Sequence, residues 1–257
     1  MPSERPGGTE MKTAVLTDLH ANREALEAVL EHAAGQRVDG YALLGDFVGY
    51  GADPGWVVDR VRELVAAGAP AVQGNHDLAT VEGASPEMRP EPRQVIDWTR
   101  SQLDAGQIEF LAGLPLRREA GKVLYVHANA WAPQDWGYIL GRMDAMRSLH
   151  ATRARITFCG HVHEPRLYHL SGTGKAGDFV PTPGVPITLL PQRRWLVIPG
   201  SVGQPRDGDP AACYAIHDEA EGSLSYWRVP YDHESAAAKI RAAGLPAALA
   251  ERLAHGI

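Results

Sequence analysis

The sequence predicts an α/β fold, and two observations support this prediction. From residue 13 to residue 77, short apolar segments alternate with segments in which apolar residues recur at helical spacing. A polar motif, often with a glycine, follows each apolar segment in this region. Strands and helices that alternate in this way form parallel strands joined by helical crossovers, with polar loops at the carboxyl ends of the strands.

In this first half, the expected helices are bounded by residues that typically begin or end helices. Gly35 and Gly68 each lie where a helical pattern stops, and Asp53 followed by Pro54 is typical of a helix N-terminus. The elements expected here are strands at residues 13–17, 40–44 and 70–73 and helices at residues 22–36 and 54–67.

The second half adds strands to a core that the first half alone could not close. A mainly helical segment at residues 92–111 precedes a hairpin that turns at Ala120 and Gly121, and an Ala-rich helical tail covers residues 234–255. Because the sequence contains no internal repeat and no linker, residues 11–257 are predicted to form a single domain. The other elements expected are a helix at 141–150 and strands at 114–119, 122–126, 155–159, 166–170, 186–191, 195–199, 212–217 and 223–229.

The bulk composition excludes several classes of protein. The chain has 257 residues, 44% of them hydrophobic, and a formal net charge of −6, so it lacks the basic footprint of stable nucleic-acid binding. No apolar run approaches the roughly 20 residues of a membrane span. Residues 1–10 form a Pro/Gly-rich leader without a signal segment, which we expect to be disordered. Two cysteines, Cys159 and Cys213, cannot form a disulfide framework, which favours a cytoplasmic setting.

Five of the apolar segments end in a polar motif, and these motifs contain the candidate metal-binding and catalytic residues. Their carboxylates, carboxamide and imidazoles suit Mn, Fe or Zn better than Ca²⁺, which prefers oxygen ligands alone, and do not match a thiolate-bound structural zinc. Each motif by itself could be a helix N-terminus, a turn or a buried histidine, but explaining all five in that way requires five independent coincidences. The motifs are Asp18-x-His20, Gly45-Asp46, Gly74-Asn75-His76-Asp77, His127 and Gly160-His161-x-His163.

Taken together, the motifs resemble those of the calcineurin-like metallophosphoesterase superfamily, in particular its small bacterial phosphodiesterase-type members. The family pattern is Asp-x-His, Gly-Asp, Gly-Asn-His-Asp/Glu, a lone His and Gly-His-x-His. All five pieces stand in this order between Asp18 and His163. The resemblance implies a four-layer α/β/β/α sandwich of two mixed sheets with the site at the strand ends, and a metal-dependent phosphoric ester hydrolase.

The same resemblance implies how the residues are shared between two divalent or trivalent metal ions. Asp46 would bridge the ions, and His76 would not be a ligand but would stabilise or protonate the departing oxygen. Two ions about 3.5–4 Å apart activate a bridging hydroxide, which attacks phosphorus in line with the leaving group. The other ligands implied are Asp18, His20 and His163 for one ion and Asn75, His127 and His161 for the other.

The loop after Asp46 narrows the expected substrate. Protein phosphatases of the superfamily carry Gly-Asp-x-Val-Asp-Arg-Gly here, whereas this chain has Gly49 and Tyr50 in place of the second carboxylate and the arginine. The same change separates it from the symmetrical dinucleoside tetraphosphate hydrolases. A site with less positive charge favours a diester monoanion over a monoester dianion. The leading hypothesis is therefore a phosphodiesterase that acts on a small phosphate ester or a nucleotide.

Two residues outside the ligand set are candidates for substrate contacts. Tyr50 follows Asp46 in the loop, and Arg206 has a planar guanidinium that suits phosphate, with a solvated surface arginine as the competing interpretation. Asp77 would either orient His76 or join a hydrogen-bond network. Two alternative functions stay open: a phosphomonoesterase or dinucleoside polyphosphate- or protein-phosphatase-like hydrolase, and an inactive metal-binding scaffold. The motifs specify neither the metal, the natural substrate nor the oligomeric state.

Overall fold

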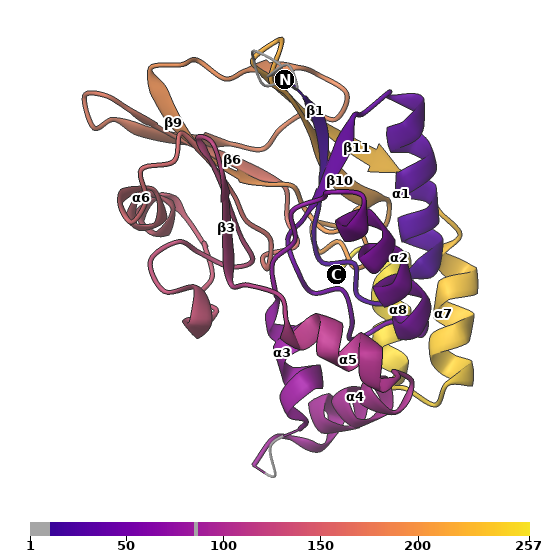
Figure 1. The fold of residues 1–257 in the computed structure, drawn as a ribbon. Coiled ribbons are helices and arrows are strands. Elements are labelled where there is room, and N and C mark those ends of the chain that lie inside the picture. The colour runs from indigo at the N-terminus through magenta and orange to yellow at the C-terminus, as the bar shows by residue number, and fades with distance from the viewer. Residues whose placement is uncertain (1–10, 85–86) are drawn as a thin grey trace, which may run out of the picture.

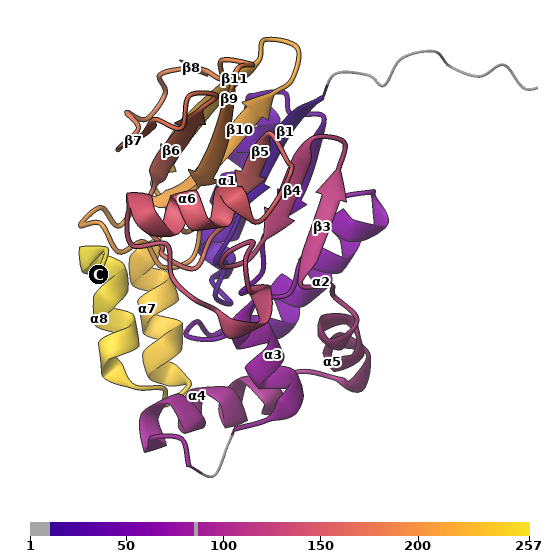
Figure 2. The ribbon, with the colours of Figure 1, turned by 90° about the vertical axis from the view of Figure 1, so that its left-hand side faces the viewer.

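The computed structural model describes residues 11–84 and 87–257, so the leader expected over residues 1–10 lies outside the described part of the chain. Two mixed β-sheets pack face to face, and helices cover the outer face of each sheet (Figure 1, Figure 2). This arrangement confirms the four-layer α/β/β/α sandwich that the resemblance implied.

The first sheet has five strands. Their spatial order is β2 (Gly40–Leu43), β1 (Lys12–Leu16), β10 (Ala212–Asp218), β11 (Ser223–Val229) and β8 (Ile187–Thr188). β1 pairs with β2 in parallel, and the other pairs are antiparallel. Side chains alternate along β1, so Val15 packs between the sheets whereas Ala14 and Leu16 pack with α1 (Arg23–Gly35) and α2 (Pro54–Ala66). These helices therefore cover the outer face of this sheet.

The second sheet has six strands. Their spatial order is β3 (Arg117–Ala120), β4 (Val123–Val126), β5 (Ile156–Phe158), β9 (Arg193–Ile198), β6 (Arg166–Ser171) and β7 (Ala176–Phe179). β4 and β5 run parallel, as β1 and β2 do in the first sheet. Phe158 packs in the same core cluster as Val15, between the sheets, whereas Leu124 packs outward with Leu149 of α6 (Arg142–His150).

The remaining helices lie at the end of the sandwich near the carboxyl ends of β1 and β2 (Figure 2). They are α3 (Asn75–Glu82), α4 (Pro90–Ser101), α5 (Ala105–Ala112), α7 (His233–Ala242) and α8 (Ala247–His255), and a short 3-10 helix, η1, covers Pro133–Asp135. Val95 of α4 packs with Ala236 of α7 and Leu249 of α8. Within residues 11–84 and 87–257, no helix is both long and apolar enough to cross a membrane.

Three expected elements are interrupted in the structure. The strand expected at residues 70–73 is a single parallel bridge between Leu43 and Ala71, because the chain turns at Gly74 to begin α3. The helix expected at residues 92–111 is two helices, and Asp104 begins the second by accepting the N–H of Gln107 at 2.8 Å. The helical tail breaks at residues 244–246, where a glycine at φ 69° precedes a leucine and a proline.

Two further details depart from the sequence-based prediction. β7 was not expected, because this edge strand is partly exposed and lacks an apolar pattern. Asp53 does stand at the N-cap of α2, but its side chain makes no capping bond. Its carboxylate accepts a hydrogen bond from Lys239 Nζ at 2.8 Å instead, which ties α2 to α7. Both cysteines, Cys159 and Cys213, are free and buried.

Candidate metal centre

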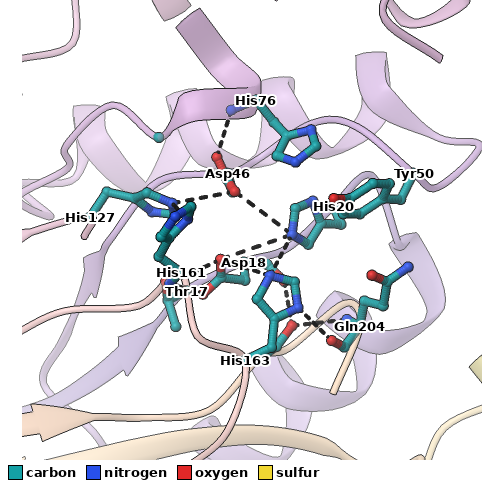
Figure 3. A network of polar contacts seen from close by, with 12 residues as sticks. Thr17, Asp18, His20, Asp46, Tyr50, His76, His127, His161, His163 and Gln204 are labelled. Carbon is teal, nitrogen blue, oxygen red and sulfur yellow. Dashed lines mark hydrogen bonds and ion pairs between the residues drawn. The ribbon is translucent and has the colours of Figure 1, made fainter. Parts of the chain in front are cut away.

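The five polar motifs meet at one edge of the sandwich (Figure 3). Loops that follow β1 and β2 of the first sheet and β4 and β5 of the second converge there, together with the first turn of α3. Parallel strands have their carboxyl ends at the same edge of a sheet, which is where α/β proteins place their sites. The Asp and His side chains brought together are at most 6% exposed: Asp18, His20, Asp46, His127, His161 and His163.

The donor atoms form two groups, and Asp46 belongs to both. In each group, the potential ligand atoms lie within 4.8 Å of one another. Asp46 Oδ2 lies 3.3 Å from His127 Nε2 and 3.8 Å from His20 Nε2, so this carboxylate faces both groups. The first group is Asp18, His20, Asp46 and His163, and the second is Asp46, His127 and His161, with Asn75 Oδ1 at 3.1 Å from His127 Nε2.

Backbone carbonyl groups orient three of the imidazoles. In each of them Nδ1–H donates to a main-chain oxygen, so Nε2 faces the centre of the site and can bind a metal ion when the imidazole is neutral. His161 has the opposite ring orientation: its Nδ1 is the nitrogen that faces the other donors, 3.2 Å from His127 Nε2. The three pairs are His20 with Val48 (3.2 Å), His127 with Leu44 (2.8 Å) and His163 with Gln204 (2.6 Å).

This donor set is suited to positive charge at its centre. His20 Nε2 and His163 Nε2 are both acceptors, yet they lie 3.1 Å apart. Burial opposes ionisation of Asp46, but His127 holds the pKa of this carboxyl well below its usual range. Burial also opposes protonation of His127, but the Asp46 carboxylate raises the pKa of this imidazole to about 9. Metal ions would supply the missing charge without a proton, so the residues fit them.

Unusual backbone conformations are concentrated in the same loops. Within the described residues, nine non-glycine residues have a positive φ, and six of them were predicted to be site residues. Each such conformation costs on the order of 1–3 kcal/mol, and clusters of them are typical of functional sites. The six, with φ between 47° and 68°, are Asp18, His20, Asp46, Tyr50, His161 and His163.

Two motif glycines let these loops approach one another. A Cβ atom on Gly74 would lie 2.2 Å from Asp46 N and Oδ1, and one on Gly160 would lie 2.5 Å from Asp18 Oδ2. The close approach at Gly74 also brings the N–H of His76 within 2.8 Å of Asp46 Oδ1, to which it donates. Both positions therefore require glycine because a Cβ atom would not fit there, and not only because of the conformation of the turn.

Asp77 joins a hydrogen-bond network that fixes the position of Asp46. Its carboxylate is fully buried and accepts four main-chain N–H groups, which accounts for both of its oxygens. The N–H of Asp46 itself is one of them, so Asp77 ties the start of α3 to the loop after β2. The donors are Gly74 (2.9 Å), Asp46 (2.9 Å), Phe47 (2.8 Å) and Val48 (3.3 Å).

Tyr50, His76 and Arg206 lie together on one side of the donors. The Tyr50 ring centroid is 4.4 Å from that of His76 and 4.5 Å from that of His20. Arg206 Nη2 lies 3.5 Å from the Tyr50 hydroxyl and 3.0 Å from Gln204 Oε1. Burial raises the pKa of Tyr50 and lowers the pKa of His76. The structure thus brings the two predicted substrate-contact residues next to the candidate centre.

Three residues at the site were missed by sequence reasoning. Thr17 Oγ1 donates to Asp18 Oδ2 at 2.7 Å, and its position beside a motif carboxylate could have suggested this contact. Tyr138 stacks on His161 with ring centroids 4.0 Å apart, and the Gln204 carbonyl accepts from His163. Tyr138 lies outside every motif. Gln204 lies in the stretch 199–206, which also resembles the small bacterial phosphodiesterase-type members and in which only Arg206 was proposed as a site residue, so the contact of Gln204 with His163 is revealed by the tertiary structure.

The fold and the clustered donors define a four-layer α/β/β/α protein with a candidate metal-binding site at one edge of its two sheets. A sequence model of the calcineurin-like phosphoesterase superfamily domain matches residues 11–222, and the chain belongs to this superfamily.

Two relatives and one more distant structural neighbour match nearly the whole chain. A crystal structure of a metallophosphoesterase from Sphaerobacter thermophilus is 37% identical, with a TM-score of 0.85, and the match covers 96% of this chain and 99% of that one. The uncharacterized protein MJ0912 of Methanocaldococcus jannaschii is 35% identical over 248 residues, which are 95% of this chain and 97% of that protein. The hypothetical protein PH1004 from Pyrococcus horikoshii shares the fold at 19% identity, with a TM-score of 0.77 and coverage of 96% and 98%.

The first prediction concerns Gly49, which has φ 88° and faces the His76 ring. A Cβ atom here would lie 2.6 Å from His76 Nδ1, so Gly49→Ala should displace the imidazole. We expect kcat to fall roughly 10²-fold, as for other small displacements of reacting groups, with metal content unchanged. Gly174→Ala is the matched control, because Gly174 also has a positive φ but no atom within 4 Å of the added Cβ. Equal activity of the two variants would contradict the positioning role.

Proposed function

We propose that this protein is a phosphodiesterase that works with two metal ions. The observation that carries the proposal is the Asp46 carboxylate, which faces both groups of buried donors. Membership of the calcineurin-like phosphoesterase superfamily supports hydrolysis of a phosphate ester. The substrate class that we propose is a small phosphodiester or a nucleotide, and Mn, Fe and Zn all suit the donors.

The seven predicted ligands divide as the two donor groups suggest. When bound, two such ions offset charge on the phosphoryl oxygens and lower the pKa of a water molecule. Asp46 is proposed to hold both ions; the main-chain N–H of His76 donates to its carboxylate, and its own main-chain N–H donates to the Asp77 carboxylate. Asp18, His20 and His163 are proposed to hold one ion, and Asn75, His127 and His161 the other.

His76 is proposed to assist the departing oxygen. Its ring lies beside the donors and packs against the rings of Tyr50 and His20, while its own main-chain N–H donates to Asp46. Burial lowers the pKa of His76, which favours the neutral form of its imidazole. A neutral imidazole still has one N–H, which can donate a hydrogen bond to the oxygen that accumulates charge as the ester bond breaks.

The small number of cationic side chains near the site supports a phosphodiester substrate rather than a phosphomonoester. Gly49 supplies no carboxylate and Tyr50 supplies no charge, where protein phosphatases of the superfamily have an acid and an arginine. Arg206 reaches the same side of the site from another loop, but its guanidinium is shared with the Tyr50 hydroxyl and the Gln204 carboxamide. A phosphodiester carries one charge, so it needs less cationic compensation than a phosphomonoester dianion.

The second prediction tests this preference directly. With Mn²⁺ present, we expect kcat/KM for bis(p-nitrophenyl) phosphate to exceed that for p-nitrophenyl phosphate by at least about tenfold, which is about 1.4 kcal/mol of transition-state stabilisation. Protein stripped with EDTA serves as the control and should turn over neither ester. A higher kcat/KM for the monoester would overturn the phosphodiesterase assignment. No turnover of any phosphate ester by the metal-loaded protein would favour the metal-binding scaffold.

A further inference from the structure

A cavity of about 270 Å³ opens beside His76 and Tyr50, between the N-terminal ends of α4 and α8. This volume is near the lower end of the about 300–1,000 Å³ that small-ligand sites have. Figure 2 shows that α4 runs beneath the ends of α7 and α8. Gln94 Nε2 of α4 donates to the Gly244 carbonyl at 2.9 Å, so this contact holds the walls of the cavity together.

The cavity combines an apolar wall with a net positive charge. Val95, Ile96 and Leu249 are buried apolar residues of its wall. Arg89 and Arg252 also line it, and neither guanidinium has a side-chain partner among the described residues. Among the described residues that line the cavity, Glu91 is the only carboxylate, so the two arginines give the cavity a net positive charge. Guanidinium groups bind phosphate well, and apolar walls bind flat rings.

The place of the cavity indicates which part of a substrate would enter it. His76 and Tyr50 line it, and both rings also lie against His20 of the candidate centre. The group that departs from phosphorus on the side of His76 would therefore extend toward α4 and α8. Because the superfamily match ends at residue 222, α8 contributes a wall that lies outside the matched region.

We propose that this cavity binds the leaving group of the substrate, and that this group is a nucleotide-sized aromatic moiety that carries a second phosphate. The inference rests on the proposed function for its catalytic step. In that step a water oxygen bonds to phosphorus, the bond from phosphorus to the leaving oxygen breaks, and a water proton ends on that oxygen. The second phosphate stays intact and is held by Arg89 and Arg252.

Binding to EDTA-treated protein tests the cavity without any contribution from metals or turnover. Isothermal titration should show that adenosine 5′-monophosphate binds about tenfold more tightly than adenosine, as expected for a charge-assisted phosphate contact. Arg89→Ala and Arg252→Ala should each reduce this preference. Arg89 is exposed, so its truncation leaves the core intact. Arg241→Ala on α7 is the matched control, because Arg241 is exposed and lies away from the cavity lining.

Kinetics then connect the cavity with the substrate. For dinucleoside monophosphates with and without a terminal phosphate, we expect kcat/KM to be about tenfold higher for the phosphorylated forms and this ratio to fall in Arg89→Ala. Equal binding of adenosine 5′-monophosphate and adenosine, or a preference that survives both arginine substitutions, would overturn the proposal. If the nucleotide binds as expected but no ester is hydrolysed, the proposed function fails and the cavity assignment stands. If esters are hydrolysed but the phosphorylated forms are not preferred, the cavity assignment fails and the proposed function stands.

Discussion

Asp46→Asn is expected to lower kcat/KM by about 10³-fold or more, on the scale of losing a group that stabilises transition-state charge. Asn is nearly the same size as Asp, and its oxygen can still accept the N–H of His76, which Asp46 Oδ1 accepts at 2.8 Å. The fold should therefore persist. What is lost is the negative charge that faces His127 and His20 from one side chain.

The physical reason is that the two donor groups share this carboxylate. Removing its charge weakens both groups at once, whereas removal of any imidazole affects one group alone. Elemental analysis of purified protein should show loss of at least one metal ion per chain. Asp59→Asn is the matched control, since Asp59 is 58% exposed on α2 and pairs with Arg62. Wild-type activity and metal content in Asp46→Asn would refute the bridging role.

Asp77→Asn is expected to destabilise the protein by about 3 kcal/mol. The Asp77 carboxylate accepts two main-chain N–H groups on each oxygen, and in asparagine one of these oxygens becomes an NH₂ group. The two buried main-chain N–H groups that donated to that oxygen then face the NH₂ group, which is itself a donor, and they lose their acceptor. For a chain of 257 residues, this loss corresponds to a fall in Tm of about 6–12 °C.

Thermal unfolding of the Asp77→Asn variant measures this effect, and activity measures its consequence for Asp46. We expect activity to fall even at temperatures where the variant remains folded, because the loop that carries Asp46 loses its anchor. Asp232→Asn is the matched control: Asp232 caps α7 by accepting Ser235 N–H at 2.9 Å, and asparagine caps helices equally well. An unchanged Tm in Asp77→Asn would show that the four hydrogen bonds are not required.

The tertiary structure decided the features that depend on contacts between distant residues. The strand expected at residues 70–73 shortened to one bridge, because Gly74 and Asp77 pull the chain toward Asp46 rather than along the sheet. Tyr138 contacts His161, and the Gln204 carbonyl accepts a hydrogen bond from His163, although no local sequence pattern predicts either contact. The cavity between α4 and α8 is likewise invisible in the sequence, because its two walls are far apart along the chain.

The sequence by itself determined the alternation of strands and helices, the order of the polar motifs and the superfamily. Strand period, helix-ending glycines and polar residues at strand ends are local signals, so each can be recognised within a few residues. Only the tertiary structure decided that backbone carbonyls orient three imidazoles and that Asp77 anchors the loop that carries Asp46. These facts depend on how two sheets pack, and no local pattern encodes the distance between segments that meet only after packing.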